Sequence, residues 1–332
     1  MLIPPRFAHE VYVLTPEQIN HDLGLHSPNV WRSLNNSHNL RLFILFSLLM
    51  LGILGIALFL KATKPAQRLG RFLNRATIIA PDLIRVAFGV SLLISASNNT
   101  VFGPELPISN FPLPYLLRAS LIVIGAALII GMFTRLFAWL AVVMFFYVLA
   151  ANGWYMFTYL NYLGEALAIA LLPTQMLSLD AFIAKLRHIK PIKPRYESYS
   201  MPVARVLFGF SIIYAAVNVK FVTSALSINV VNQYHLTNYF PVDPLLLVLA
   251  AGLIECLIGF MYMLGLLQRF NTVFFLIFLA LSLAFFKEDV WPHYLLIALA
   301  IGIFLHKPDN WALDGRLFSK QKSRHLPNKA GT

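Results

Sequence analysis

The stretch that decides the fold is IRVAFGVS at residues 84–91, because it returns as ARVLFGFS at residues 204–211. A second pair of stretches recurs further along the chain: NYL followed by ALAI within 161–169 matches HYL followed by ALAI within 293–301. The two motifs come in the same order in each half of the 332 residues. Internal self-similarity of this kind indicates repeated structural units. The sequence therefore predicts two similar units in tandem.

The composition is typical of a membrane protein. The chain is 58% hydrophobic and 12% charged, with a mean hydropathy of +0.70, whereas a soluble domain carries about 25% charged residues. Its formal net charge of +12 comes from basic residues clustered in connecting loops. No basic helix is interleaved with aromatic residues, so a nucleic-acid partner is not expected. The single cysteine, Cys256, lies in an apolar run, which excludes an intrachain disulfide or a CxxC redox pair.

Apolar segments of membrane-spanning length follow one another along most of the chain. We predict spans at about 42–61, 82–98, 115–132, 136–153, 156–173, 202–219, 244–265, 270–286 and 291–306. Each is close to the ~20 residues that a helix needs to cross the hydrocarbon core. Strand alternation is absent, and an open sheet would leave backbone groups unpaired in lipid. We expect an all-α polytopic membrane protein with about nine transmembrane helices.

The basic residues orient these spans. Most of the 26 Lys and Arg residues fall on one side of the predicted membrane, which the positive-inside rule assigns to the cytoplasm. We therefore predict a multi-pass protein of the bacterial plasma (inner) membrane, with its N-terminus outside and its C-terminus inside. Residues 1–41 become an extracytoplasmic segment, 42–61 an extra helix, and 315–332 a basic cytoplasmic tail. Four spans per unit is an even number, so both units should share one orientation, as parallel repeats do.

The first forty residues lack the basic start and apolar core of a signal peptide. The stretch FAHEVY at 7–12 nevertheless looks like the start of an exported segment. Two hypotheses account for it. Either a cleaved signal lies upstream of this chain, or a short tail is carried across the membrane by the first span.

Further features are duplicated in the two units. A helix opens after Pro81 and again after Pro202, as suits a proline in the first turn of a helix. A second helix ends in GMFTR at 131–135 and in GLLQR at 265–269, and the units close with LSLD at 177–180 and WALD at 311–314. With these motifs in this order, the chain resembles the DoxX family of small four-helix membrane proteins. The resemblance covers about 82–180 and 202–314.

This resemblance implies a function. Similar proteins include the membrane subunit of a quinone-linked oxidoreductase and membrane anchors of redox-protective complexes. It therefore implies that this chain is the membrane component of such a system, with quinone as a candidate cofactor. A redox protein subunit is then a candidate partner beside the lipid bilayer. The second unit keeps the polar positions of the family at Arg205, Lys220, Glu255 and His293, where the first unit has Arg85, Thr100, Leu121 and Asn161.

Glu255 is the strongest candidate for chemistry, because it lies near the middle of the predicted 244–265 span. A carboxylate at mid-bilayer costs roughly 2.5–3.5 kcal/mol on insertion scales. We expect it to accept a proton or anchor a ligand; the alternative is a structural ion pair. Arg205, on the preceding helix, is assigned with Glu255 as a catalytic pair in which it balances the carboxylate charge. The alternative is that Arg205 snorkels to lipid headgroups.

Two further residues are assigned to cofactor binding. Lys220 lies about 22 Å along the helix from Arg205, so these two cations are not expected to share a site. His293 lies at the outer mouth of the last span, where a histidine can shuttle protons, ligate haem or hydrogen-bond a quinone. The alternative for His293 is a structural place in the aromatic belt of the interface. His235, in an external loop, lacks ligand spacing to His293, so no metal site is predicted.

Glu165 is a second predicted intramembrane carboxylate, one turn after Asn161. It is either functional or paired with Arg85 or Arg135. The motifs of soluble enzymes are missing: there is no P-loop, no GxGxxG after a strand, no HExxH and no nucleophile elbow. The sequence does not decide whether the chain is an enzyme. Two rival functions therefore stay open beside the quinone-linked one: a small-molecule or proton-coupled transporter, and a non-catalytic membrane anchor or assembly factor.

Overall fold

The computed structural model describes residues 12–24, 26–172, 177–188, 196–287, 290–309 and 311–316. Nearly all of the FAHEVY stretch at 7–12 lies outside the described residues, so the hypotheses about an exported start stay predictions. The same holds for most of the predicted basic tail at 315–332.

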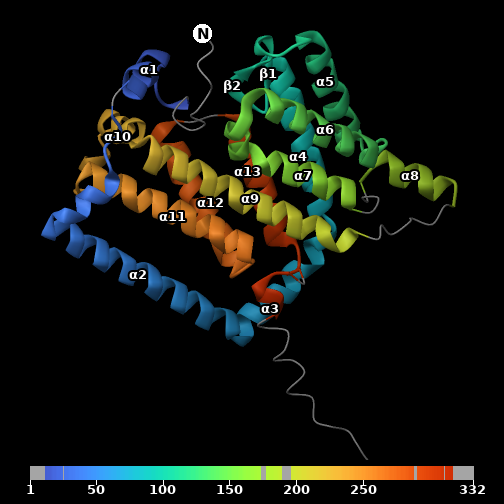
Figure 1. The fold of residues 1–332 in the computed structure, drawn as a ribbon. Coiled ribbons are helices and arrows are strands. Elements are labelled where there is room, and N and C mark those ends of the chain that lie inside the picture. The colour runs from blue at the N-terminus through green and yellow to red at the C-terminus, as the bar shows by residue number, and fades with distance from the viewer. Residues whose placement is uncertain are drawn as a thin grey trace, which may run out of the picture.

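Helices make up most of the described chain (Figure 1). The N-terminal part forms α1 (Pro16–Gly24), η2 (Val30–Asn35), α2 (Ser37–Ala62), α3 (Lys64–Leu73) and η3 (Asn74–Ile78). The first helix group consists of α4 (Ala80–Ser97), α5 (Pro114–Ile130), α6 (Thr134–Asn152) and α7 (Leu160–Leu171). The second helix group consists of α9 (Ser200–Ala216), α11 (Pro244–Leu264), α12 (Gln268–Phe286) and α13 (Trp291–Leu305). The connecting elements are β1 (Thr100–Val101), β2 (Gly103–Pro107), η4 (Ile108–Asn110), η5 (Gly153–Tyr159), α8 (Leu179–Leu186), η6 (Glu197–Tyr199), η7 (Val217–Val222), α10 (Ser224–Gln233) and η8 (Leu236–Asn238).

Six helical stretches among the described residues are long and apolar enough to cross a membrane. They are Ser37–Ala62, Ala80–Ser97, Thr134–Leu171, Glu197–Val222, Pro244–Leu264 and Gln268–Phe286. The third stretch, of 38 residues, contains both α6 and α7. Two shorter apolar helices, Pro114–Ile130 and Trp291–Leu305, complete the two groups. This agrees with the prediction of a helical, multi-pass membrane protein.

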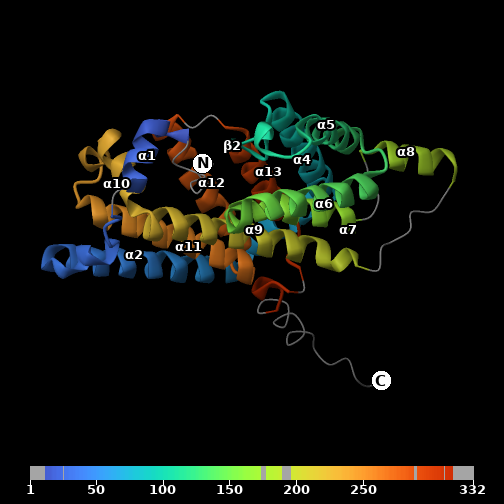
Figure 2. The same ribbon diagram turned by 45° about the horizontal axis from the view of Figure 1, so that its top comes forward.

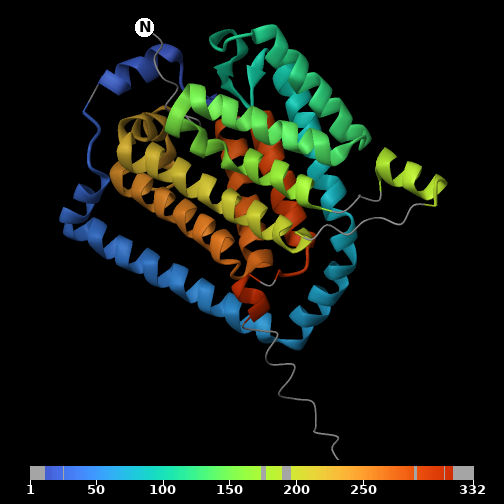
Figure 3. The ribbon, with the colours of Figure 1, turned by 45° about the vertical axis from the view of Figure 1, so that its right-hand side comes forward.

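The two helix groups pack against each other through the first and last helices of each group, as Figures 1 and 3 show. Within each group, the first helix packs closely on the second: α4 on α5, and α9 on α11. Between the groups, the last helix of one packs on the first helix of the other: α7 on α9, and α13 on α4. Small residues allow this approach. A Cβ atom at Gly302 of α13 would lie 2.7 Å from the side chain of Ile84 in α4.

The hydrophobic core is therefore shared between the groups. One continuous cluster of buried residues includes Phe88 of the first group together with Phe208 and Leu299 of the second. The shared core means that neither group is a separate bundle.

Helix α2 lies along the outside of α11 (Figure 2). Only 6% of the residues in its most apolar stretch are buried within the protein, so most of its surface is available to lipid. Its last turn is tied down by an ion pair between Lys61 and Asp314. Helix α3 follows at the same end, where the Arg269 guanidinium donates to the Gly70 carbonyl at 3.1 Å.

Two short features were not predicted from the sequence. Strands β1 and β2 form an antiparallel hairpin, with Thr100 opposite Pro107 and Val101 opposite Gly103. Helix α9 continues as a π-helical turn, η7. We call the end of the helices that carries this hairpin and α10 the hairpin end, and the opposite end, where Arg85 and Arg205 lie, the arginine end.

Candidate functional site

The second helix group contains an ion pair in the interior of the helical stretches. Lys220 Nζ lies 2.9 Å from Glu255 Oε1, and each side chain is 15% exposed. Glu255 lies about 16 Å along α11 from its first residue, which is near the middle of the helix. The two opposite charges thus lie within helical stretches that are long and apolar enough to cross a membrane.

The π-helical turn brings Lys220 to this position. In η7 the backbone widens, and the Thr223 N–H donates to the Asn218 carbonyl at 2.9 Å, five residues back. Such turns interrupt the regular register of an α-helix and are frequent at functional sites. On α11, Gly252 has no side chain to obstruct the turn: a Cβ atom there would lie 2.8 Å from the Phe221 ring and 3.2 Å from Lys220 Cβ.

Helix α10 and η2 pack against the segment that carries Lys220, at the hairpin end. The Ser227 hydroxyl of α10 donates to the Val219 carbonyl at 3.1 Å, and the Ser224 hydroxyl donates to the Pro28 carbonyl. The Trp31 ring of η2 stacks on Phe221 with a centroid distance of 5.9 Å. Helix α10 and η2 thus contact the residues on either side of Lys220.

The predicted pairing of Arg205 with Glu255 is wrong. Arg205 Nε instead donates to Asp309 Oδ2 at 3.2 Å. Its Nη1 donates to the carbonyls of Tyr262 and, at 2.6 Å, of Met263. With 2% of its surface exposed, Arg205 does not snorkel to lipid headgroups either. It satisfies the unpaired carbonyls at the C-terminal end of α11, where a cation is favourable. Arg205 and Lys220 have different partners, which agrees with the prediction that these two cations do not share a site.

Arg85 has an equivalent set of contacts in the first group. Its Nη2 donates to Asp82 at 3.1 Å, and its Nη1 donates to the carbonyls of Leu128 and, at 2.9 Å, of Ile129 at the end of α5. The two arginines thus hold the same helix end in each group. The sequence analysis named neither acidic partner: Asp82 lies three residues before Arg85, and Asp309 lies more than a hundred residues after Arg205.

A third polar cluster lies at the hairpin end and is built around Glu105, which the sequence analysis did not single out. Tyr155 donates to Glu105 Oε1 at 2.7 Å, and Tyr159 donates to the same oxygen. Tyr12 donates to Oε2 at 3.4 Å. Burial raises the pKa of Glu105 above its ordinary value, and the hydrogen bonds from Tyr159 and Tyr155 oppose that rise. No sequence signal marks Glu105, because its partners come from distant segments.

His293 lies beside this cluster. It is buried, with 2% of its surface exposed, and its ring contacts that of Tyr12 edge to face at a centroid distance of 5.7 Å. The two predicted cofactor-binding residues thus have different partners. The His293 ring contacts Tyr12, whereas Lys220 pairs with Glu255. His235 is exposed at the start of η8, and Cys256 is half-buried next to Glu255.

Glu165 is fully buried in α7, and neither of its carboxyl oxygens has a hydrogen-bond partner among the described residues. The alternative that it pairs with Arg85 or Arg135 is therefore wrong for these residues. The Arg85 guanidinium is directed to Asp82 and backbone carbonyls. Arg135 Nε donates to the Leu172 carbonyl at 3.4 Å.

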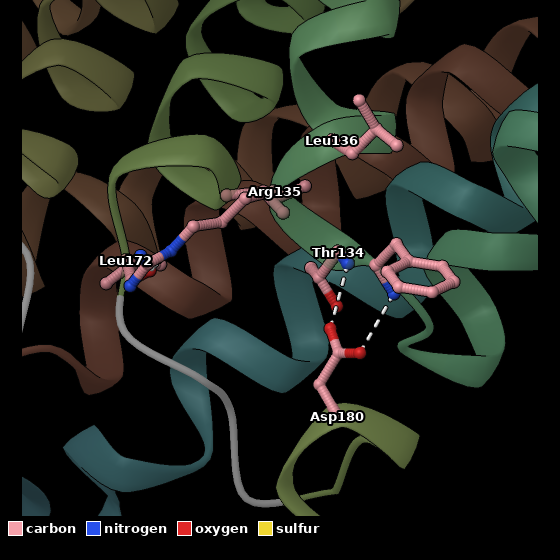
Figure 4. Close-up of a pocket in the computed structure, with 7 residues that line it drawn as sticks. Thr134, Arg135, Leu136, Leu172 and Asp180 are labelled. Carbon is pink, nitrogen blue, oxygen red and sulfur yellow. Dashed lines mark hydrogen bonds between the residues drawn. The ribbon is translucent and has the colours of Figure 1, made fainter. Parts of the chain in front are cut away.

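A pocket of about 310 Å³ opens at the arginine end (Figure 4). Its lining consists of Phe133, Thr134, Arg135, Leu136, Ile169, Leu172 and Asp180. Both carboxylate oxygens of Asp180 are occupied: they accept from the backbone N–H groups of Phe133 and Thr134, each at 2.9 Å. The one carboxylate of this pocket thus serves the start of α6 and is not directed at a ligand.

The described residues contain no group of three or more His, Cys, Asp or Glu side chains that could hold a metal ion. Besides the two arginine sites, the polar groups described above are the Lys220–Glu255 pair, the Glu105 cluster and Glu165. Comparison with known proteins found no matching family model, no matching curated protein and no matching solved structure.

Proposed function

We propose that this chain is the membrane component of a quinone-linked or redox-protective system, and that the Lys220–Glu255 pair binds the quinone head group. In this proposal the chain has nine spans: α2, followed by two DoxX-like four-helix units that correspond to the two helix groups. It lies in the bacterial inner membrane with the arginine end in the cytoplasm. A redox protein subunit is the proposed partner.

Equivalent contacts in the two groups support the proposed duplication. Arg85 and Arg205 each bind two consecutive carbonyls of the second helix. Asp314 accepts from the N–H groups of Leu267 and Gln268, as Asp180 does at the start of α6. Duplicated motifs thus make duplicated contacts, which random similarity of apolar segments would not produce.

The observation that carries the functional proposal is the Lys220–Glu255 pair itself. A quinone presents carbonyl oxygens that accept hydrogen bonds, and a quinol presents hydroxyl groups that donate them. The Lys220 ammonium is a donor and the Glu255 carboxylate is an acceptor, so together they suit both forms. Each side chain keeps 15% of its surface exposed, which leaves room for a ligand atom. Bound quinone would supply two-electron redox chemistry, while Glu255 would accept or return a proton.

Quinone binding to purified protein tests this proposal. The protein is reconstituted in quinone-free lipid nanodiscs and titrated with a short-chain ubiquinone. The readout is Trp31 fluorescence in a background where the other four tryptophans are replaced by phenylalanine, because the Trp31 ring contacts Phe221. Glu255→Gln removes the charge from one hydrogen bond. We expect it to weaken binding about tenfold, since a hydrogen bond to a charged group contributes about 1.5–3 kcal/mol. Lys220→Met should weaken binding at least as much.

Glu197→Gln, which changes a carboxylate of η6 at the arginine end, is the matched control and should bind quinone normally. Equal affinity in all variants, or no binding to the wild-type protein, would overturn the proposal. Substrate flux into proteoliposomes that is lost in Glu255→Gln would favour the transporter instead. An anchor would tolerate Glu255→Gln and lose a co-purifying subunit when its cytoplasmic loops are changed.

A further inference from the structure

Helix α3 (Lys64–Leu73) turns across the end of α2 and does not continue in its direction (Figures 1 and 3). The change of direction begins at Thr63, whose backbone is extended, with φ −72° and ψ 151°. Pro65 follows in the first turn of α3, where its missing N–H needs no partner. Because α2 is long and apolar enough to cross a membrane, we expect α3 to lie where the hydrocarbon ends and the lipid headgroups begin.

One face of α3 is held on the second helix group. The Arg269 guanidinium of α12 donates to the Gly70 carbonyl at 3.1 Å and to Asn74 Oδ1, directly after α3, at 2.6 Å. A Cβ atom at Gly70 would lie 3.0 Å from Arg269 Nη1, so the two segments approach closely. The Lys61–Asp314 ion pair holds the last turn of α2 at the same end of the molecule. These contacts fix the directions of the other two faces of α3.

The second face of α3 is apolar and exposed. Leu69 and Phe72, at a spacing of three residues, lie on one side of the helix and are 58% and 65% exposed. None of the 10 residues of α3 is buried. Ile78 and Ile79, which follow in and after η3, are exposed as well. Large apolar side chains are unfavourable in water and favourable among acyl chains, so this face indicates contact with lipid.

The third face of α3 is basic. Lys64, Arg68 and Arg71 recur at steps of four and three residues, which is the spacing of one helix face, and Arg75 follows four residues later in η3. All four residues of this basic row are exposed. The ion pairs among the described residues involve none of them, and the segment 61–79 contains no acidic residue. The basic row therefore draws its counterions from outside this segment.

From these three faces we infer that α3 lies in the membrane surface at the arginine end and binds the phosphate groups of anionic phospholipids. Leu69 and Phe72 insert among the acyl chains, while the basic row contacts the lipid phosphates. Amphipathic helices with a basic polar face bind anionic membranes in this way. A soluble anion would satisfy the basic row alone, whereas a lipid also covers the apolar face beside it. The inference holds whether or not quinone binds at Lys220–Glu255.

Quenching of a fluorophore on α3 by spin-labelled lipid tests the inference. Phe72→Cys, in a Cys256→Ser background that leaves no other cysteine, is labelled with a nitrobenzoxadiazole fluorophore. The protein is reconstituted in nanodiscs of phosphatidylcholine and phosphatidylglycerol, with a nitroxide on the acyl chain of one lipid or of the other. We expect both lipids to quench, and phosphatidylglycerol to quench about twofold more strongly, because the basic row enriches anionic lipid. No quenching by either lipid, or equal quenching by both, would overturn the inference.

The basic row is tested in the same labelled protein. A triple variant neutralises three of its four residues: Arg68→Gln/Arg71→Gln/Arg75→Gln. We expect the two lipids to quench this variant equally. The matched control neutralises three exposed arginines at the hairpin end: Arg32→Gln/Arg41→Gln/Arg118→Gln. It should keep the stronger quenching by phosphatidylglycerol. A preference that survives in the first variant, or that is lost equally in the control, would show that α3 does not select the lipid and would overturn the inference.

Discussion

At the scale of single residues, two aspartates hold equivalent helix starts with unequal strength. Among the described residues, Asp180 accepts from the N–H groups of Phe133 and Thr134. Asp314 makes the same two contacts at the start of α12 and also pairs with Lys61 of α2. We predict that Asp180→Ala lowers the free energy of unfolding by about 1 kcal/mol, the typical loss for a helix cap. For Asp314→Ala we predict about 3 kcal/mol, because the half-buried Lys61 also loses its partner.

Thermal unfolding of the variants in detergent measures this difference. The double variant Lys61→Met/Asp314→Ala is the control, since it removes both charges of the pair. It should be less destabilised than the sum of the two single variants. Equal losses for Asp180→Ala and Asp314→Ala would show that the Lys61 contact contributes nothing to stability.

How far the residues could be predicted depends on whether the residue itself stands out in the sequence. Glu255 was singled out because a carboxylate in an apolar run is visible in the sequence itself. Its pairing with Lys220 was not predicted, because Lys220 lies on a different helix, in a π-helical turn that the sequence does not reveal. Glu105 was missed altogether, since its partner Tyr12 is 93 residues away. Tertiary contacts of this kind leave no periodic signal in the sequence.

At the scale of elements, a pair of glycines sets the distance between the first two helices of each group. A Cβ atom at Gly259 of α11 would lie 2.6 Å from the Gly209 carbonyl of α9, and a Cβ at Gly125 would lie 2.8 Å from the Gly89 carbonyl. We predict that Gly259→Ala and Gly125→Ala each destabilise the protein by about 1–3 kcal/mol, because backbone cannot move aside as a side chain can. Thermal unfolding in detergent measures both.

Gly55→Ala in α2 is the matched control, because nothing lies within 4 Å of a Cβ atom at that position. It should leave stability unchanged or raise it slightly, since alanine favours a helix more than glycine does. Comparable destabilisation by Gly55→Ala would mean that the loss reflects helix composition and not the close crossing of α9 and α11.

The helices themselves were predicted well, and the short elements were not. Each predicted span overlaps a helix, and six helical stretches among the described residues are long and apolar enough to cross a membrane. Long apolar runs are read correctly because an α-helix satisfies its own backbone groups in lipid. The hairpin at Thr100–Pro107 is too short to show strand alternation, and it carries Gly103, where a Cβ atom would collide with the Tyr159 hydroxyl. Its shape follows from the contacts it makes with η5 and not from its own propensity.

At the scale of the whole molecule, the tandem motifs indicate how many groups there are but not how they join. Separate bundles would be compatible with the same sequence. The contacts of α7 with α9 and of α13 with α4 instead build one body with a shared core. This arrangement follows from small residues such as Gly164, where a Cβ atom would lie 3.2 Å from Ala204 Cα. Such surfaces look alike in sequence whether they face lipid or another helix.

The shared core also fixes one orientation for the whole protein, which labelling of single cysteines tests. Cys256→Ser gives a cysteine-free background, since the chain has one cysteine. In it, Tyr115→Cys places a thiol at the start of α5 near the hairpin end, where the native residue is 87% exposed. Leu177→Cys places one at the arginine end, where the native residue is 75% exposed.

Because basic residues such as Lys64 and Arg68 gather at the arginine end, we predict that this end faces the cytoplasm. A membrane-impermeant maleimide should therefore label the cysteine at 115 in intact spheroplasts and the cysteine at 177 only after lysis. The reverse pattern would invert the proposed topology, and labelling of both from outside would show that positions 115 and 177 do not lie on opposite sides of the membrane.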